Sequence, residues 1–268
     1  MTLPRKVIFE NHSDLTGFWR NVLFMKPEDL LGLLIPVTYL VMLAIEQWKP
    51  ARIFPHIRWW QGIGAMFVVV LLAINAVLPS LLPVEWIADH SLIHGSTLPL
   101  GAQIVLGFGL VTLVNYLFHV IQHRFTILWR WQHQLHHSPQ RVDISGSAYT
   151  HPFEVITFTL MFLAITVFIL GLSSLAAAWI GYVGAFLAMF QHWNIRTPRW
   201  LGYFIQRPES HCWHHEPGQA RYNFGDLPLW DLVFGTFYNP EAFSGPVGFD
   251  EPAAKRVKDM LLGRQVSF

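Results

Sequence analysis

Long apolar stretches separated by short polar segments dominate this chain. They cover residues 30–46, 62–83 and 98–123, and a longer one covers residues 153–193. About 20 apolar residues cross a bilayer as a helix, so each of the first three predicts one helix. The fourth is interrupted by "GLSS" at 171–174 and predicts a hairpin of two short spans, or re-entrant helices. We therefore expect an all-α integral membrane protein with four to five transmembrane or re-entrant helices.

The composition agrees with this pattern and excludes several functional classes for the protein. The chain is 53% hydrophobic and 13% charged, with a mean hydropathy of +0.36, whereas about a quarter of the residues in soluble domains are charged. A net charge of +1 gives no basic field, so no nucleic-acid partner is expected. The single cysteine, Cys212, excludes an internal disulfide and a multi-thiolate metal site. We expect a single membrane domain over residues 1–268, with its helices in about 30–193.

Lysine and arginine in the short loops predict the orientation in the membrane. The loop at 84–97 and the turn at 171–174 contain neither residue, whereas the segments after the first and third stretches and after Trp193 contain several. We expect these basic segments in the cytoplasm, which makes residues 124–150 and 194–240 a cytoplasmic cap. The N-terminal segment also contains basic residues, so the orientation of the first helix stays open: Arg5, Lys6, Arg20 and Lys26.

Histidines are concentrated on this predicted cytoplasmic side. "HQLHH" and "HCWHH" repeat one triplet spacing, and a pair four residues apart ends the third apolar stretch. On a helix, the first and last members of a triplet share a face, and the middle member lies one step around. We expect these imidazoles to converge, whereas His12, His56, His90 and His94 are interpreted as ordinary polar residues. The candidate metal ligands are His119, His123, His133, His136, His137, His151, His192, His211, His214 and His215.

The number of histidines indicates the kind of centre. Neutral imidazole binds iron, copper, zinc and nickel, and one ion takes about four to six ligands, so this set predicts two ions. Together with a membrane setting, it favours redox chemistry on a lipid, because acid–base groups do not attack an unactivated C–H bond. Two other classes stay open: a zinc-dependent membrane hydrolase or metal carrier, and a b-type haem protein.

Several segments, in order, resemble the membrane-bound fatty acid hydroxylase / sterol desaturase superfamily. "HVIQH" (119–123), "HQLHH" (133–137) and "HCWHH" (211–215) are similar to its three histidine boxes. "YTHPFE", "QHWNIRTP" and "YNFGDLPLWDLVFGTF" are similar to its flanking elements. The resemblance covers roughly residues 40–240. It implies an O₂-dependent di-iron oxygenase that hydroxylates or desaturates a sterol, a fatty acyl chain or a related lipid.

The resemblance also implies cofactors and partners. Two iron ions, replaceable by zinc during purification, would be held by the histidines above. Glu154, Asn223 and Asp231 are candidates for orienting the imidazoles, although Asp231 suits a turn or helix cap equally well. No dinucleotide-binding glycine motif occurs, so we expect a separate electron donor such as a ferredoxin or cytochrome. A basic surface including Arg196, Arg199 and Arg207 would dock it or contact lipid headgroups.

Overall fold

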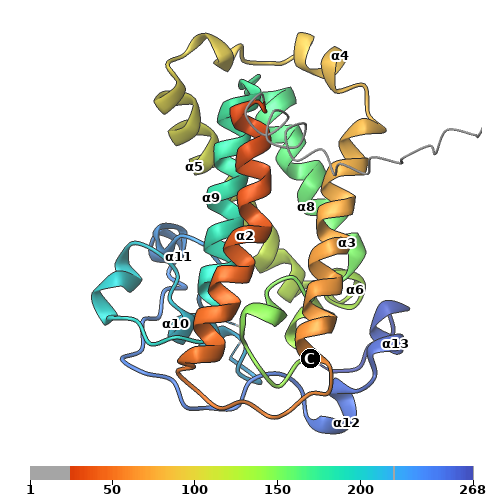
Figure 1. The fold of residues 1–268 in the computed structure, drawn as a ribbon, viewed down its shortest axis with the longest axis vertical. Coiled ribbons are helices and arrows are strands. Elements are labelled where there is room, and N and C mark those ends of the chain that lie inside the picture. Colours follow the sequence, from red (N-terminus) through yellow and green to blue (C-terminus); the bar gives the residue numbers. More distant parts are fainter. Residues whose placement is uncertain (1–24, 220, 268) are drawn as a thin grey trace, which may run out of the picture.

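Five long helices form the body of the molecule (Figure 1). The computed structural model describes residues 25–219 and 221–267, so three of the N-terminal basic residues, together with His12, lie outside the described residues. Within these ranges the fold is all-α, and five helices are long and apolar enough to cross a membrane. The chain is therefore a multi-pass membrane protein, as predicted. The helices are α2 (Pro27–Trp48), α3 (Trp60–Ser80), α5 (Leu100–Arg124), α8 (Pro152–Leu163) with its π-helical extension η4 (Ala164–Ile169), and α9 (Ser174–His192).

Local sequence explains where these helices begin. Pro27 and Pro152 open α2 and α8, where the missing N–H of proline breaks no helical hydrogen bond. The Ser173 side chain caps α9 by accepting the N–H of Ala176. The turn that ends at Ser173 separates α8–η4 from α9, which confirms the predicted hairpin. In the resulting bundle, α9 packs against both α2 and α5, and α3 packs against α8.

Short elements lie at the two ends of the bundle. At the top of Figure 1 are α4 (Val84–Asp89) and η1 (Gly95–Thr97). The cap, beside and below the lower half of the bundle, holds the histidine-rich segments. It contains α6 (Thr126–Leu128), η2 (Trp129–His133), α7 (Gln134–His137), η3 (Ile144–Gly146), η5 (Arg199–Tyr203), α10 (Pro208–His214), α11 (Pro228–Phe234), α12 (Glu251–Ala254) and α13 (Val257–Leu261).

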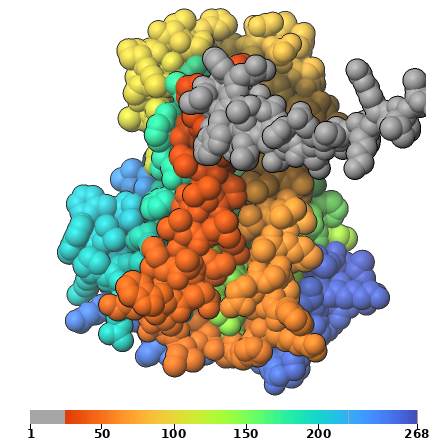
Figure 2. Space-filling model, in the orientation of Figure 1, coloured from red at the N-terminus to blue at the C-terminus, as the bar shows by residue number. Residues whose placement is uncertain are grey.

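A buried carboxylate joins α2 to this cap. Glu46 is 2% exposed and accepts the backbone N–H of Ile144 at 3.0 Å and of Asn194 at 2.9 Å. Asn194 follows the last histidine of α9 by two residues, so this contact helps to fix the end of α9 that carries His192. On the face shown in Figure 2, α2 and α3 form the surface of the bundle, and the C-terminal segment lies at its lower end.

Candidate metal centre

The last turn of α5 supplies the first two histidines. His119 and His123 lie one helical turn apart, and their Nε2 atoms are 3.3 Å from each other. The Nδ1 of His119 contacts the carbonyl oxygen of Phe224 at 2.6 Å. A carbonyl only accepts, so His119 carries its proton on Nδ1 and turns the lone pair of Nε2 inward.

"HQLHH" begins at the last residue of the π-helical turn η2 and continues through α7. A π-helix usually occurs as a single turn, and such turns are frequent at functional sites. The Nε2 of His133 lies 2.9 Å from that of His119 and 3.0 Å from that of His137. The Nδ1 of His133 donates to a carboxylate oxygen of Glu154 at 2.8 Å. The Nε2 lone pairs of His119 and His133 therefore face each other without a proton between them.

His214, from α10, completes the first group. Its Nδ1 lies 2.8 Å from the carbonyl oxygen of Tyr222. Its Nε2 is buried and has no hydrogen-bond partner among the described residues. One nitrogen from each of five histidines lies within 4.8 Å of the others: His119, His123, His133, His137 and His214.

A second group of four histidines lies beside the first: His136, His192, His211 and His215. Its Nε2 atoms form a chain with steps of 3.1 Å, from His136 to His192, His211 and His215. The Nδ1 of His192 contacts the carbonyl oxygen of Ala188 at 2.7 Å, and that of His136 contacts the carbonyl oxygen of Tyr149 at 3.4 Å. The two groups touch where the rings of His137 and His215 stack, with centroids 4.1 Å apart.

Burial keeps the cap histidines uncharged. It lowers the pKa of His136 to about 4 and lowers the pKa of His133, His137 and His214 well below 6.5. Burial is the largest cause in each case, and neighbouring imidazoles lower the pKa further. The imidazoles are therefore neutral near pH 7, which is the form that binds metal.

The spacing of the nitrogens fits transition-metal ions. Two imidazole nitrogens bound to one ion at about 2.0–2.1 Å lie about 2.8–3.4 Å apart, for angles between a right angle and the tetrahedral angle. Neighbouring Nε2 atoms are 2.9–3.3 Å apart in six pairs of the two groups. Facing lone pairs at this distance repel, and a cation between them removes the repulsion. The two groups therefore have the donor type, spacing and protonation state for two metal ions.

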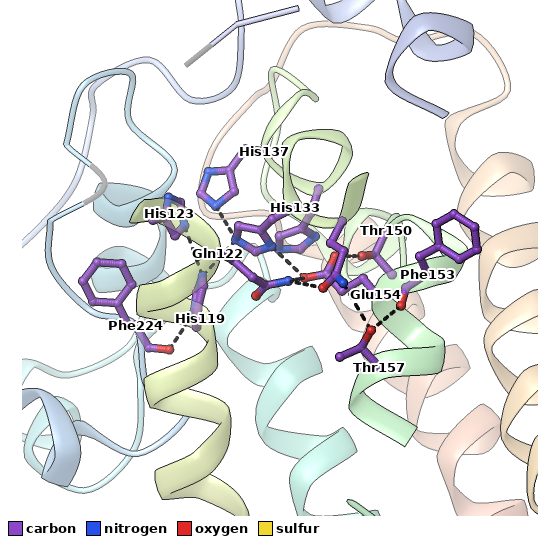
Figure 3. A network of polar contacts seen from close by, with 12 residues as sticks. His119, Gln122, His123, His133, His137, Thr150, Phe153, Glu154, Thr157 and Phe224 are labelled. Atoms are coloured by element: carbon purple, nitrogen blue, oxygen red, sulfur yellow. Dashed lines mark hydrogen bonds and ion pairs between the residues drawn. The ribbon is translucent and has the colours of Figure 1, made fainter. Parts of the chain in front are cut away.

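Glu154, at the start of α8, is the centre of a polar network behind the first group (Figure 3). It is 4% exposed, and besides His133 it accepts hydrogen bonds from the Gln122 side chain at 2.8 Å and from the Thr150 hydroxyl. Gln122, which is fully buried, lies within the "HVIQH" segment but was not among the predicted site residues. An amide between the two histidines of "HVIQH", at the end of an apolar stretch, was the signal available in the sequence.

Asp231 and Asn223 form no hydrogen bond with an imidazole of the described residues; they hold the turn that follows α10. Asp231 is fully buried and accepts the backbone N–H groups of Phe224 and Gly225, each at 2.9 Å. Asn223 has a left-handed backbone, with φ of 61°, and its side chain donates to the Ser210 carbonyl. Both residues therefore position the Phe224 carbonyl that orients His119.

His151 lies outside both groups. Its Nδ1 accepts the backbone N–H of Phe153 at 3.1 Å, which caps α8, and its Nε2 lies 3.2 Å from the carbonyl oxygen of Leu261. Both ring nitrogens thus have backbone partners. His90 and His94 lie at the opposite end of the bundle and bond locally, to Trp86 and Ser91.

Arg207 does not belong to a docking surface, contrary to the prediction. It is fully buried, its guanidinium donates to Asn239 and Pro240, and it pairs with Glu209 at 3.1 Å. The sequence does not distinguish a buried arginine that links two loops from an arginine on the surface. Arg196 and Arg199 are exposed.

Comparisons with known proteins agree with this site. A family model described as fatty acid hydroxylase matches residues 104–236, a range that contains all nine clustered histidines. The chain is 27% identical over 255 residues to the ornithine lipid hydroxylase OlsE of Rhizobium tropici, covering 87% of this chain and 71% of that protein. No solved structure matches the chain. Residues 104–236 thus match the fatty acid hydroxylase family, and the two comparisons together support the fatty acid hydroxylase superfamily and an oxidoreductase that acts on lipids.

Proposed function

We propose that this protein is an O₂-dependent di-iron oxygenase that hydroxylates a membrane lipid at an unactivated C–H bond. The observation that carries the proposal is the pair of buried groups of neutral imidazoles, whose Nε2 lone pairs face one another at 2.9–3.3 Å. Carboxylate-free sets of this size suit iron, copper or zinc. Of these, iron and copper carry out oxygen chemistry, and the match to the fatty acid hydroxylase family favours iron.

The nine clustered histidines would hold the two ions. His119, His123, His133, His137 and His214 would bind one, and His136, His192, His211 and His215 would bind the other. When bound, the iron pair would supply the reductive activation of O₂ that an unactivated C–H bond requires. His151 is assigned the structural role of capping α8, because its ring nitrogens have backbone partners.

The chain itself orients the imidazoles and keeps water away from them. Carbonyl oxygens and Glu154 hold protons at the outer Nδ1 atoms, so the inner Nε2 atoms stay free. The Phe224 ring packs on His119, His123 and His214 with centroids 5.3–5.5 Å apart. The Trp129 ring packs on His123 and His137 with centroids 5.2 and 5.4 Å apart. These two rings would shield a reactive centre from solvent.

One described cavity, of about 660 Å³, borders the centre. Three clustered histidines line it, namely His137, His214 and His215, and its outer wall comes from residues 246–256 and 266–267. Protons can enter this way. The two electrons that accompany each O₂ would come from a separate ferredoxin-like or cytochrome-like donor, for which the exposed Arg196 and Arg199 offer positive charge.

The two alternative classes fit the geometry less well. A haem needs space for a porphyrin between two histidines, and here the facing nitrogens are about 3 Å apart. A zinc hydrolase needs a carboxylate base beside its open coordination position. Glu154 instead accepts the Nδ1–H of His133, whereas the Nε2 of that ring faces the other histidines of the group.

Metal content and product analysis test the proposal. We expect the protein purified from iron-replete cells to contain about two irons per chain, as for a di-metal site, and His214→Ala to lose metal and activity. His56→Ala, an exposed residue outside the cluster, is the matched control. Because the Rhizobium tropici relative is named an ornithine lipid hydroxylase, an ornithine-headed lipid is the first substrate to test.

The reaction should transfer one atom of O₂ to the lipid and the other to water. With ¹⁸O₂, the product should therefore carry one heavy oxygen atom. A haem spectrum, a protein that contains no metal, or a product that carries oxygen from water would each reject the di-iron oxygenase. A product that has lost two hydrogens and gained no oxygen would instead identify a desaturase.

A further inference from the structure

Helix α11 has its polar side facing in and its apolar side facing out. Asp231 on its inner side is fully buried, whereas the outer residues Leu229, Leu232, Val233 and Phe234 are 50–62% exposed. A helix at a water-exposed surface shows the reverse distribution. Contiguous exposed apolar residues mark contact with lipid or with another protein.

The neighbouring segment η5 extends this apolar face. α11 and η5 pack against each other. Trp200, Tyr203 and Phe204 in and just after η5 are 63%, 54% and 68% exposed, and Arg199 beside them is also exposed. Tryptophan, tyrosine and arginine are enriched where a protein crosses the boundary between headgroups and acyl chains. We call the seven apolar residues of these two elements the α11–η5 face.

Contacts with α5 indicate how deep the α11–η5 face lies along the membrane-spanning part of the bundle. The Trp230 indole donates to the Thr112 hydroxyl at 3.0 Å, and the ring of Phe234 stacks on that of Tyr116 with centroids 5.2 Å apart. At about 1.5 Å per residue, Thr112 and Tyr116 lie about 18 and 24 Å along α5 from Leu100. The hydrocarbon core of a bilayer is about 30 Å thick. Figure 1 accordingly shows α11 beside the spanning helices, above the lower end of α2.

The apolar surface of α5 continues past this level. Leu117 and Ile121 are exposed on α5 beyond Tyr116, and Phe125 is exposed directly after it. Arg124 is the first charged residue of α5. The exposed apolar surface of α5 therefore extends past the level of Thr112 and Tyr116, where α11 contacts this helix.

We propose that the α11–η5 face is a non-spanning membrane contact, inserted among the acyl chains of the leaflet on the side of the histidine cluster. The same helix reaches the centre from its inner side, because Asp231 holds the Phe224 backbone and the Phe224 carbonyl orients His119. The membrane contact is thus two hydrogen bonds away from a clustered histidine. This inference stands on the position of α11 and does not depend on which metal the cluster holds.

Spin labels test the proposal in vesicles made of equal parts of phosphatidylcholine and phosphatidylglycerol. Nitroxides are attached to Val233→Cys and, in a second protein, to Leu229→Cys. Val69→Cys on α3 gives the lipid reference and Lys255→Cys on α12 the water reference, since both residues are exposed. Wild-type protein gives the background, because Cys212 is buried and burial raises its pKa to about 12.

We expect both α11 labels to collide with oxygen more than with a polar nickel chelate, as at Val69→Cys. The collision ratio should exceed that at Lys255→Cys about tenfold, because polar solutes are excluded from hydrocarbon. A ratio equal to that at Lys255→Cys would overturn the proposal. Labels shielded from both reagents, with dipolar broadening between chains, would also overturn it and identify a second copy as the partner. The readout needs neither metal nor activity, so it stays separate from any failure of the proposed oxygenase function.

Discussion

At the scale of single residues, the cluster depends on what lies behind each imidazole. Three carbonyl oxygens and one carboxylate receive the outer Nδ1 atoms at 2.6–2.8 Å: those of Phe224, Tyr222, Ala188 and Glu154. A carbonyl holds the ring through a dipole, whereas Glu154 is a buried carboxyl group that also accepts hydrogen bonds from Gln122 and Thr150. Glu154 should therefore contribute most to the affinity of the first group for metal.

Glu154→Gln tests this contribution. The amide keeps the shape of the side chain but removes the charge that stabilises His133, and loss of such a partner typically weakens metal binding about 10–100-fold. We expect the variant to lose metal at a correspondingly lower chelator concentration, measured by metal analysis after dialysis. Glu85→Gln, an exposed carboxylate at the far end, is the control. Identical chelator curves for the two variants would contradict the role assigned to Glu154.

At the scale of elements, residues 249–267 act as a strap beneath "HQLHH", and we call them the C-terminal strap. Trp129 donates to the Ser267 carbonyl, Arg130 donates to that of Gly263, and Gln134 exchanges two hydrogen bonds with Arg264 and Val266. The strap follows the end of the family match at residue 236. It therefore adds support for η2 and α7 that the matched region does not supply.

Gly263→Ala should loosen the C-terminal strap. Gly263 has φ of 63°, and a Cβ there would lie 2.3 Å from the Trp131 ring, so the substitution combines backbone strain with a steric clash. We expect a loss of roughly 1–3 kcal/mol, seen as a lower thermal midpoint by intrinsic fluorescence and as faster proteolysis after residue 248. Gly218→Ala, with φ of 80° but open space around it, separates strain from clash. Equal midpoints for both variants would show that the contact with Trp131 does not matter.

At the scale of the whole molecule, five spanning helices put residue 26 and the cap on opposite sides of the membrane. Exposed basic residues lie at the cap end, among them Arg58, Arg196 and Arg199, whereas the loop at 84–97 contains no lysine or arginine. Basic loops stay in the cytoplasm. The histidine cluster should therefore face the cytoplasm, where reduced electron donors are available.

Cysteine accessibility in intact cells checks this orientation. We expect Lys255→Cys to react with a membrane-impermeant maleimide only after the cells are permeabilised, because α12 lies at the cap end. His90→Cys, exposed at the opposite end, should react in intact cells. The reverse pattern would place the cap and its histidines outside.

Much of the fold was predictable because its strongest signals are local. Apolar length indicated the spanning helices, and the interruption at 171–174 indicated the hairpin. The residues that support the centre were harder to find, because their partners are distant in sequence. Glu46 contacts Asn194, and Gln122 contacts Glu154. Arg207 was assigned wrongly for the same reason, since its burial depends on Asn239 and Pro240.

The histidine triplets separate what the sequence determined from what the tertiary structure decided. Spacing alone puts the first and last members of each triplet on one face and turns the middle member away, because a helix repeats every 3.6 residues. The fold then exchanges the middle members: His136 joins the group of His211 and His215, and His214 joins that of His133 and His137. Only the packing of α7 against α10 brings these side chains together, because no local spacing relates residues so far apart in the chain.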